Sequence, residues 1–120
     1  EKLGSSGGHP GGFLLSSLHG AAQTALDHGL VPRTLDLDCK AVSLIPELLP
    51  AHSSHQCFWR MSAEVSLRLA RIIDSPCVND AHSSSIKTSL EKLKTKLRLK
   101  GASSSKLMLM ELGNRLLRFA

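Results

Sequence analysis

Apolar residues return along this chain at steps of three and four, which is the spacing of one face of an α-helix. The first such stretch predicts a helix over about residues 13–28, and Gly29 after it suits the left-handed turn that often ends a helix. Residues 1–12 are rich in glycine and serine and are expected to form a flexible linker. Because the chain begins at Glu1 inside such a linker, we expect it to be a fragment of a longer protein.

A second apolar stripe runs over residues 37–49 and stops at Pro50, which predicts a second helix. Pro32 should break the chain before this helix. Three side chains with oxygen atoms are candidates for its N-cap: Thr34, Asp36 and Asp38. Pro46 lies inside the stripe and has no backbone N–H, so it should kink the helix or end its regular part.

Three more helices are predicted in the rest of the chain. The third covers about 57–73, and its regular apolar period indicates the most buried helix. The fourth runs from Ile86 to a stop at Gly101, and the fifth reaches the end of the chain. Serine runs before these last two helices offer N-caps: Ser83, Ser84 and Ser85, then residues 103–105. Because only a short break separates them, the last two helices should form an αα-hairpin.

Composition supports a single all-α domain over residues 13–120. Aromatic residues make up only 3% of a chain of 120 residues, so the core must be aliphatic, which favours helices over a β-sandwich. Three cysteines are too few for a disulfide scaffold, and a reducing compartment is the simpler expectation. No apolar run approaches the roughly 18–20 residues of a membrane span, so we expect a soluble protein without a membrane partner.

Charge is divided unevenly along the chain. The net charge is +5. Residues 86–120 hold nine Lys or Arg and two Glu (+7), whereas residues 1–85 hold six Lys or Arg and eight Asp or Glu (−2). Over residues 87–106, Glu91 is the one acid, too little for pairing within the helix. Such a surface attracts polyanions, although a solvated face that keeps the domain soluble remains the plain alternative. The seven cations are Lys87, Lys92, Lys94, Lys96, Arg98, Lys100 and Lys106.

No arrangement typical of an enzyme is present in the sequence. His52, His55 and Cys57 form an H-x2-H-x-C cluster, but a closed zinc site needs a fourth ligand and none is evident. Cys57 near His55 lacks an orienting acid and an oxyanion loop. The glycines of residues 4–12 precede no strand–helix unit that would cradle phosphate. We therefore expect no enzymatic activity, no metal and no cofactor.

Three segments in order show a resemblance to a known family: LDLDCKAVSLIPELL (35–49), AEVSLRLARII (63–73) and SLEKLKTKLRLKGASSSKLMLMEL (89–112). The matching positions are Asp38, Cys39, Ile45, Pro46, Ser66, Leu67, Arg68, Leu69, Leu93, Lys94, Gly101, Lys106, Leu107, Glu111 and Leu112. This order resembles the C-terminal domain of katanin regulatory subunits over residues 35–112.

The resemblance implies an all-helical module that binds the N-terminal helical bundle of the katanin catalytic AAA ATPase, to which ATP hydrolysis would belong. It also implies contact with microtubules, recruitment of spindle-pole or minus-end proteins, and a place in the cytoplasm on the cytoskeleton, at the spindle pole or basal body. The basic hairpin suits the glutamate-rich tails of tubulin, and its seven cations are the expected microtubule contacts.

Six apolar residues are the expected contacts of the ATPase, although each could equally belong to the core of this domain: Leu44, Leu48, Val65, Leu69, Leu112 and Leu116. Trp59, the single tryptophan, is a candidate for core or groove packing or for an interface anchor. Two other classes stay open. One is a helical nucleic-acid-binding module, which would show a steep dependence on salt, and the other is a generic adaptor.

Overall fold

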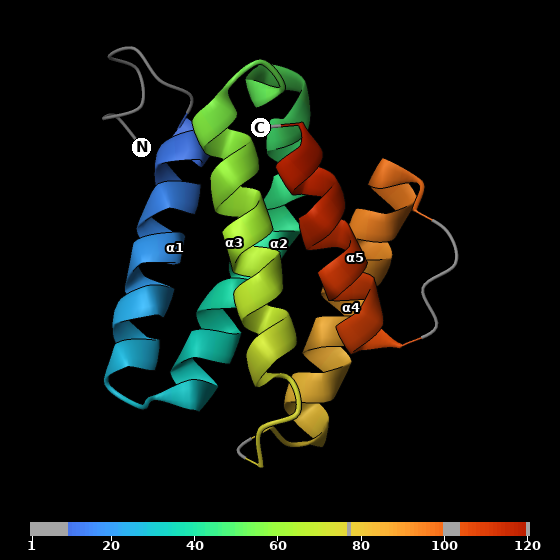
Figure 1. The fold of residues 1–120 in the computed structure, drawn as a ribbon. Coiled ribbons are helices and arrows are strands. Elements are labelled where there is room, and N and C mark those ends of the chain that lie inside the picture. The colour runs from blue at the N-terminus through green and yellow to red at the C-terminus, as the bar shows by residue number, and fades with distance from the viewer. Residues whose placement is uncertain (1–9, 77, 100–103, 120) are drawn as a thin grey trace.

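The computed structural model describes residues 10–76, 78–99 and 104–119, with side chains described from residue 14 onward. Within these ranges the chain forms five α-helices and no strand, which confirms the all-α prediction (Figure 1). The helices are α1 (Pro10–Asp27), α2 (Val31–His52), α3 (Gln56–Ile72), α4 (Asp80–Leu97) and α5 (Ser105–Arg118). No helix in these ranges is both long and apolar enough to cross a membrane.

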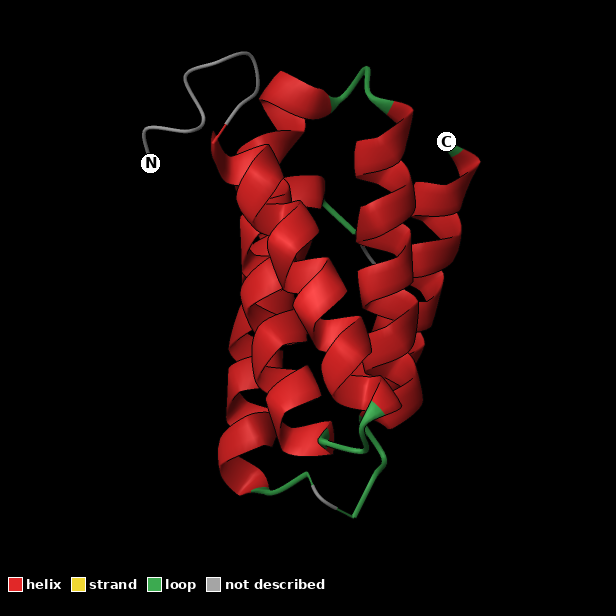
Figure 2. Cartoon of the chain, turned by 90° about the vertical axis from the view of Figure 1, so that its left-hand side faces the viewer, coloured by secondary structure: helices red, strands yellow, loops and turns green. Residues whose placement is uncertain are grey.

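The five helices lie side by side along one long axis (Figures 1 and 2). From α1 to α4 successive helices alternate in direction; α2 packs against α1, α3 and α4, and α5 packs along α3. By contrast, α4 and α5 run in the same direction and contact each other only slightly. The predicted αα-hairpin, which requires antiparallel helices, is therefore wrong. As a result, the C-terminal ends of α2, α4 and α5 meet at one end of the bundle.

The first helix starts earlier than the sequence predicted. It begins at Pro10, so the linker prediction is wrong for residues 10–12, and residues 1–9 lie outside the described ranges. Proline suits the first helical position because no helical hydrogen bond uses its missing N–H. At the other end Gly29 has a φ of 75°, and the Leu30 N–H donates to the Ala25 carbonyl at 2.8 Å. This turn confirms Gly29 as the left-handed stop.

The second helix is longer than predicted at both ends. It begins at Val31, so Pro32 lies in its first turn and does not break the chain. The three predicted N-caps are therefore helical residues with other partners: Thr34 donates to the Leu30 carbonyl, Asp36 pairs with Lys40, and Asp38 is buried. Pro46 does not end the helix, which continues past the predicted stop at Pro50 to His52. Burial of Ile45 and Leu48 beside the proline outweighs the one lost backbone hydrogen bond.

The fourth helix begins at Asp80 instead of Ile86. The Asn79 side chain caps it by accepting a hydrogen bond from the His82 N–H at 3.0 Å, so the three serines predicted as caps lie inside the helix. It ends at Leu97, before the predicted stop at Gly101, which lies outside the described ranges. The cap of α5 is confirmed, because the Ser104 hydroxyl accepts from the Leu107 N–H at 3.3 Å.

The core is aliphatic, as the composition predicted. Each helix contributes at least one fully buried leucine: Leu15, Leu35, Leu69, Leu93 and Leu109. Nine of the 17 residues of α3 are buried, against ten of 22 in α2, four of 18 in α4 and five of 14 in α5. Among these four helices, α3 is thus the most buried, as predicted. Its position in contact with both α2 and α5 explains that burial.

Candidate interaction surfaces

The cations of α4 lie on both flanks of its buried face, so the helix is not basic on one side only. The buried face consists of Ile86, Ser89, Leu90 and Leu93. Lys92 faces α2, where its Nζ lies 3.2 Å from Glu47 Oε2. Lys96, one turn further along, lies on the same flank and is exposed.

The opposite flank carries a row of three cations, which we call the α4 stripe: Lys87, Lys94 and Arg98. Lys94 follows Lys87 by seven residues, which at about 100° per residue places it within about 20° of Lys87 around the helix, and Arg98 is the C-cap residue directly after α4. Lys87 and Arg98 are exposed and Lys94 is half-buried, and none has an ion pair with a described residue. Glu91 shares this flank, but one acid against three cations leaves the stripe with an excess of positive charge.

Two of the seven expected microtubule contacts are already paired with acids from other parts of the chain. Lys92 pairs with Glu47, as above, and Lys106 Nζ lies 2.8 Å from Asp74 Oδ2. The sequence count treated Glu91 as the one opposing acid, and the fold adds these two. Lys100 lies outside the described ranges. Four of the seven therefore remain as exposed or half-exposed cations without a described acid partner: Lys87, Lys94, Lys96 and Arg98.

The apolar residues expected at the ATPase interface are mostly core residues. Five of the six are at most 2% exposed: Leu48, Val65, Leu69, Leu112 and Leu116. Leu44 is half-buried and packs against the same core. Leu48, Val65 and Leu69 lie inside the bundle, where a docked protein cannot reach them, so their assignment to the interface is wrong. Leu112 and Leu116, although buried, line the groove described next. The helical period that selected them reports burial, and the domain itself provides that burial.

An apolar groove of about 340 Å³ lies where the C-terminal ends of the helices meet. Its wall is aromatic on one side: the Trp59 and Phe119 rings stack with centroids 5.0 Å apart, and the Trp59 indole N–H donates to the Ser53 carbonyl at 2.8 Å. Phe119 is 67% exposed although it is apolar. Leu97, the last residue of α4, and Leu99 also line the groove. The sequence identified Trp59 as a groove or anchor candidate but not its partner from α5.

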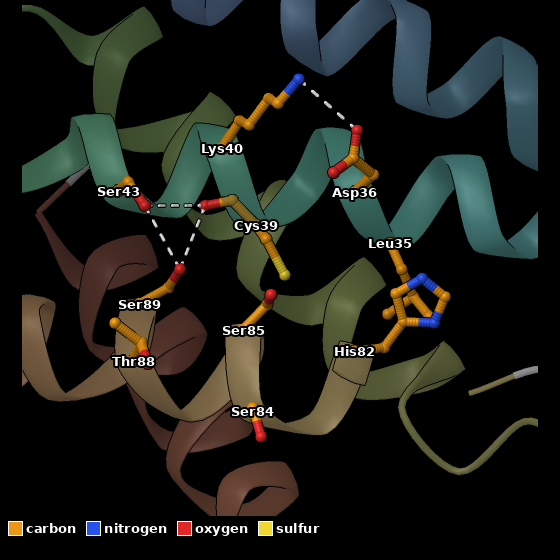
Figure 3. A pocket seen from close by; sticks show the side chains of 10 residues that line it. All are labelled: Leu35, Asp36, Cys39, Lys40, Ser43, His82, Ser84, Ser85, Thr88 and Ser89. Carbon is orange, nitrogen blue, oxygen red and sulfur yellow. Dashed lines mark hydrogen bonds and ion pairs between the residues drawn. The ribbon is translucent and has the colours of Figure 1, made fainter. Parts of the chain in front are cut away.

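A second hollow, of about 400 Å³, lies between α2 and α4, and half of its ten lining residues carry hydroxyl groups (Figure 3). Ser89 Oγ lies 3.2 Å from Ser43 Oγ and 3.4 Å from the carbonyl oxygen of Cys39. Burial raises the pKa of the Cys39 thiol to about 12, so the sulfur stays protonated at neutral pH. These hydroxyls satisfy the polar groups of two packed helices, and no described hydrogen bond links one of them to His82 in the same hollow.

The turn between α2 and α3 brings together two members of the predicted H-x2-H-x-C cluster. Nδ1 of His52 lies 3.0 Å from Nδ1 of His55. Cys57, the third member, is exposed in the first turn of α3. Over the ranges that the structure describes, no three metal-ligating side chains come together in one group. The two histidines therefore belong to the turn, where His52 also stacks on Phe58.

Fold and surface together define the class: an all-α domain with a cationic stripe on one helix and an aromatic groove at one end of the bundle. Comparison with known protein families, curated proteins and solved structures finds no match to this chain.

Proposed function

We propose that this chain is a non-enzymatic helical interaction module that contacts microtubules and docks a severing ATPase of the katanin type. The resemblance to katanin regulatory subunits over residues 35–112 supports a katanin-type ATPase and microtubules as the partners. The α4 stripe carries the proposal, because it offers three cations without a described acid partner on one flank of α4 and at its C-cap. This function places the protein in the cytoplasm on microtubules, with spindle-pole or minus-end proteins as further partners.

The α4 stripe suits a flexible polyanion such as the glutamate-rich tail of tubulin. A row of Lys and Arg side chains without acid partners attracts such a tail from several ångströms away, and salt screens the attraction over about 10 Å. Each exposed contact contributes less than about 1 kcal/mol, so affinity requires several cations acting together. Lys96 can add to the contact from the other flank. Lys92 and Lys106 contribute less, because binding would first break their ion pairs.

The backbone at Arg98 gives a second, weaker support. Arg98 has a φ of 57°, and in the described ranges it is the one non-glycine residue with a positive φ. A left-handed conformation costs roughly 1–2 kcal/mol for a residue other than glycine. The chain thus keeps an arginine where glycine would be more stable. A contact that needs this cation explains the choice.

Co-pelleting with microtubules tests the proposal. We expect K87E/K94E/R98E to weaken pelleting about tenfold or more and to flatten its dependence on salt, with helix content unchanged by circular dichroism. The matched control is R33E/R60E/R71E, which reverses three exposed cations of α2 and α3 and brings the net charge from +5 to the same −1. Equal weakening by both variants would show that net charge alone matters and would overturn the assignment to α4.

Two further measurements separate tubulin from other polyanions. Subtilisin removes the tubulin tails. The wild-type chain should bind such stripped microtubules no more tightly than K87E/K94E/R98E binds intact ones. A duplex oligonucleotide should compete only weakly at moderate salt. Tight binding of the duplex with unchanged pelleting on stripped microtubules would favour a nucleic-acid-binding module instead.

A further inference from the structure

The groove at the end of the bundle combines features of a docking site for a partner protein. Trp59 is half-buried, Phe119 is largely exposed, and their stacked rings form an apolar wall. Large aromatic and arginine side chains dominate the energy of protein interfaces, and both kinds line this groove. A single exposed phenylalanine is ordinary on a protein surface. Phe119, however, stacks on the single tryptophan and lines a groove of about 340 Å³, which is typical of an interaction site.

The shape of the groove favours a helical occupant. Along α5, Leu112, Leu116 and Phe119 follow one another at steps of four and three, so they line the groove in a row parallel to the helix axis. Leu97 and Leu99, at the end of α4, line the same groove. A groove lined by apolar residues from both helix ends accepts the apolar face of an amphipathic helix, whose side chains repeat at the same steps.

The charge of the groove selects the chemistry of that helix. Arg115 and Arg118 line it, and none of its described lining residues is an acid. Arg118 has no ion pair with a described residue, while Arg115 is held by Glu111 one turn earlier, with Arg115 Nη2 2.7 Å from Glu111 Oε2. A helix that brought lysines to this rim would be repelled, and one that brought carboxylates would pair with Arg118.

We propose that this groove docks an amphipathic helix of a partner protein, with leucine-like residues on its buried face and glutamate or aspartate along its edges. The inference rests on the proposed function only in taking the chain to be an interaction module. Of the six predicted ATPase contacts it keeps Leu112 and Leu116, which line the groove, and it is independent of the α4 stripe.

A display library of helical peptides with randomised surface positions, selected for binding to the full chain, tests the proposal. We expect the selected peptides to be amphipathic and acidic. Trp59 reports their binding directly, because it is the only tryptophan of the chain and lies in the groove. Binding should shift its emission to shorter wavelength. The same peptides with lysine in place of glutamate should bind at least about tenfold more weakly.

Two substitutions on α5 provide a matched pair. Phe119→Ala should weaken the selected peptides about tenfold or more, as expected for an interface anchor. Leu117→Ala removes a comparable exposed apolar side chain that does not line the groove, and it should change affinity less than about twofold. Arg118→Glu should weaken the acidic peptides and strengthen their lysine counterparts.

Three outcomes would overturn the proposal: a library that yields no peptide sensitive to Phe119→Ala, selected peptides that are basic or extended, or a dimer of the chain, detected by light scattering, that Phe119→Ala dissociates. The last would mean that a second copy fills the groove. Phe119→Ala should leave microtubule pelleting unchanged, and K87E/K94E should leave peptide binding unchanged. Failure of the groove and failure of the proposed function are thus separate results.

Discussion

Arg68 of α3 holds Asp38 of α2 inside the bundle through three hydrogen bonds. Arg68 Nη2 lies 2.6 Å from Asp38 Oδ1, and Nε lies 3.2 and 2.9 Å from Oδ1 and Oδ2. The Asp38 side chain is fully buried, and that of Arg68 is 4% exposed. Burial raises the pKa of the Asp38 carboxyl, and the Arg68 guanidinium opposes that rise. Gln23 of α1 accepts a further bond from Arg68 at 3.2 Å, so one side chain joins three helices.

Breaking this pair on one side should be costly. Arg68→Met leaves the Asp38 carboxylate buried without a partner and should lower the free energy of unfolding by about 3–5 kcal/mol. The double variant D38L/R68M should recover a large part of that loss, because a packed apolar pair avoids the cost of burying charge. Urea unfolding followed by far-UV circular dichroism measures both. Arg115→Met, which breaks the exposed pair with Glu111, serves as the control and should cost less than about 1 kcal/mol. An equally small effect at Arg68 would contradict the prediction.

Gly113 lets α5 approach α3 closely. A methyl group added there would lie 2.6 Å from Cγ and 2.8 Å from Cδ2 of Leu67, closer than packed carbon atoms allow. Gly113→Ala should therefore destabilise the fold by about 1–2 kcal/mol, after the helix-propensity gain of alanine is subtracted from the cost of overpacking. Gly20→Ala in α1 is the opposite case, because its added methyl group meets nothing within 4 Å. It should raise stability by up to about 1 kcal/mol.

The Leu67 side chain decides whether this explanation is right. In the background of Leu67→Ala, the clash partner is gone, and Gly113→Ala should cost nothing or stabilise the helix. Thermal or urea unfolding of the four variants of this double-mutant cycle measures the coupling between the two positions. A cost at Gly113 that persists without the leucine side chain would show that the backbone of α3, and not Leu67, limits the approach.

Helix number and helix faces could be predicted from the sequence, because both follow from the period of apolar residues. The ends could not, because several residues compete for each cap and tertiary packing decides among them. Asp38 shows this clearly. Aspartate is a common N-cap residue, and nothing in the local sequence reveals that this one pairs with Arg68, thirty residues later. The direction of α5 was missed for a similar reason, since a break of a few residues does not determine whether the next helix runs antiparallel or parallel to the one before it.

The candidate surfaces could be predicted only in part. Charge segregation identified the cations of α4, but ion pairing of Lys92 and Lys106 depends on acids brought close by the fold. Four of the six predicted ATPase contacts do not line the groove, because core and interface leucines share one period. Exposure separates them: Leu69 is fully buried, whereas Phe119 is 67% exposed. A sequence signal for the groove existed in the Arg-Phe pair at the end of α5, which breaks the expectation of a polar helix end.

Asn79 should matter more to α4 than the serines of its first turns. It accepts a hydrogen bond from the His82 N–H, and Asp80 adds a negative charge at the positive end of the helix. We expect Asn79→Ala to lower the free energy of unfolding by about 1 kcal/mol. Ser84→Ala, at an exposed position inside the helix, should be neutral or slightly stabilising because alanine is the better helix former. The reverse order of effects, measured by urea unfolding, would restore the serine run as the true start of the helix.

The cysteines should differ widely in reactivity, because thiol exchange requires the thiolate. Burial among apolar side chains, with Asp38 and Asp36 nearby, raises the pKa of Cys39 to about 12, whereas Cys57 is exposed. At pH 8 a thiol with a pKa of about 12 is ionised to roughly one part in ten thousand. In single-cysteine variants made by replacing the other two, the exposed Cys57 should therefore react with a disulfide reagent at least about a hundredfold faster than the buried Cys39. Guanidinium chloride should abolish the difference, since unfolding exposes both thiols. Comparable rates in the folded protein would mean that α2 opens readily around Cys39 and that the core between α2 and α4 is looser than the packing of Leu35 and Leu90 implies.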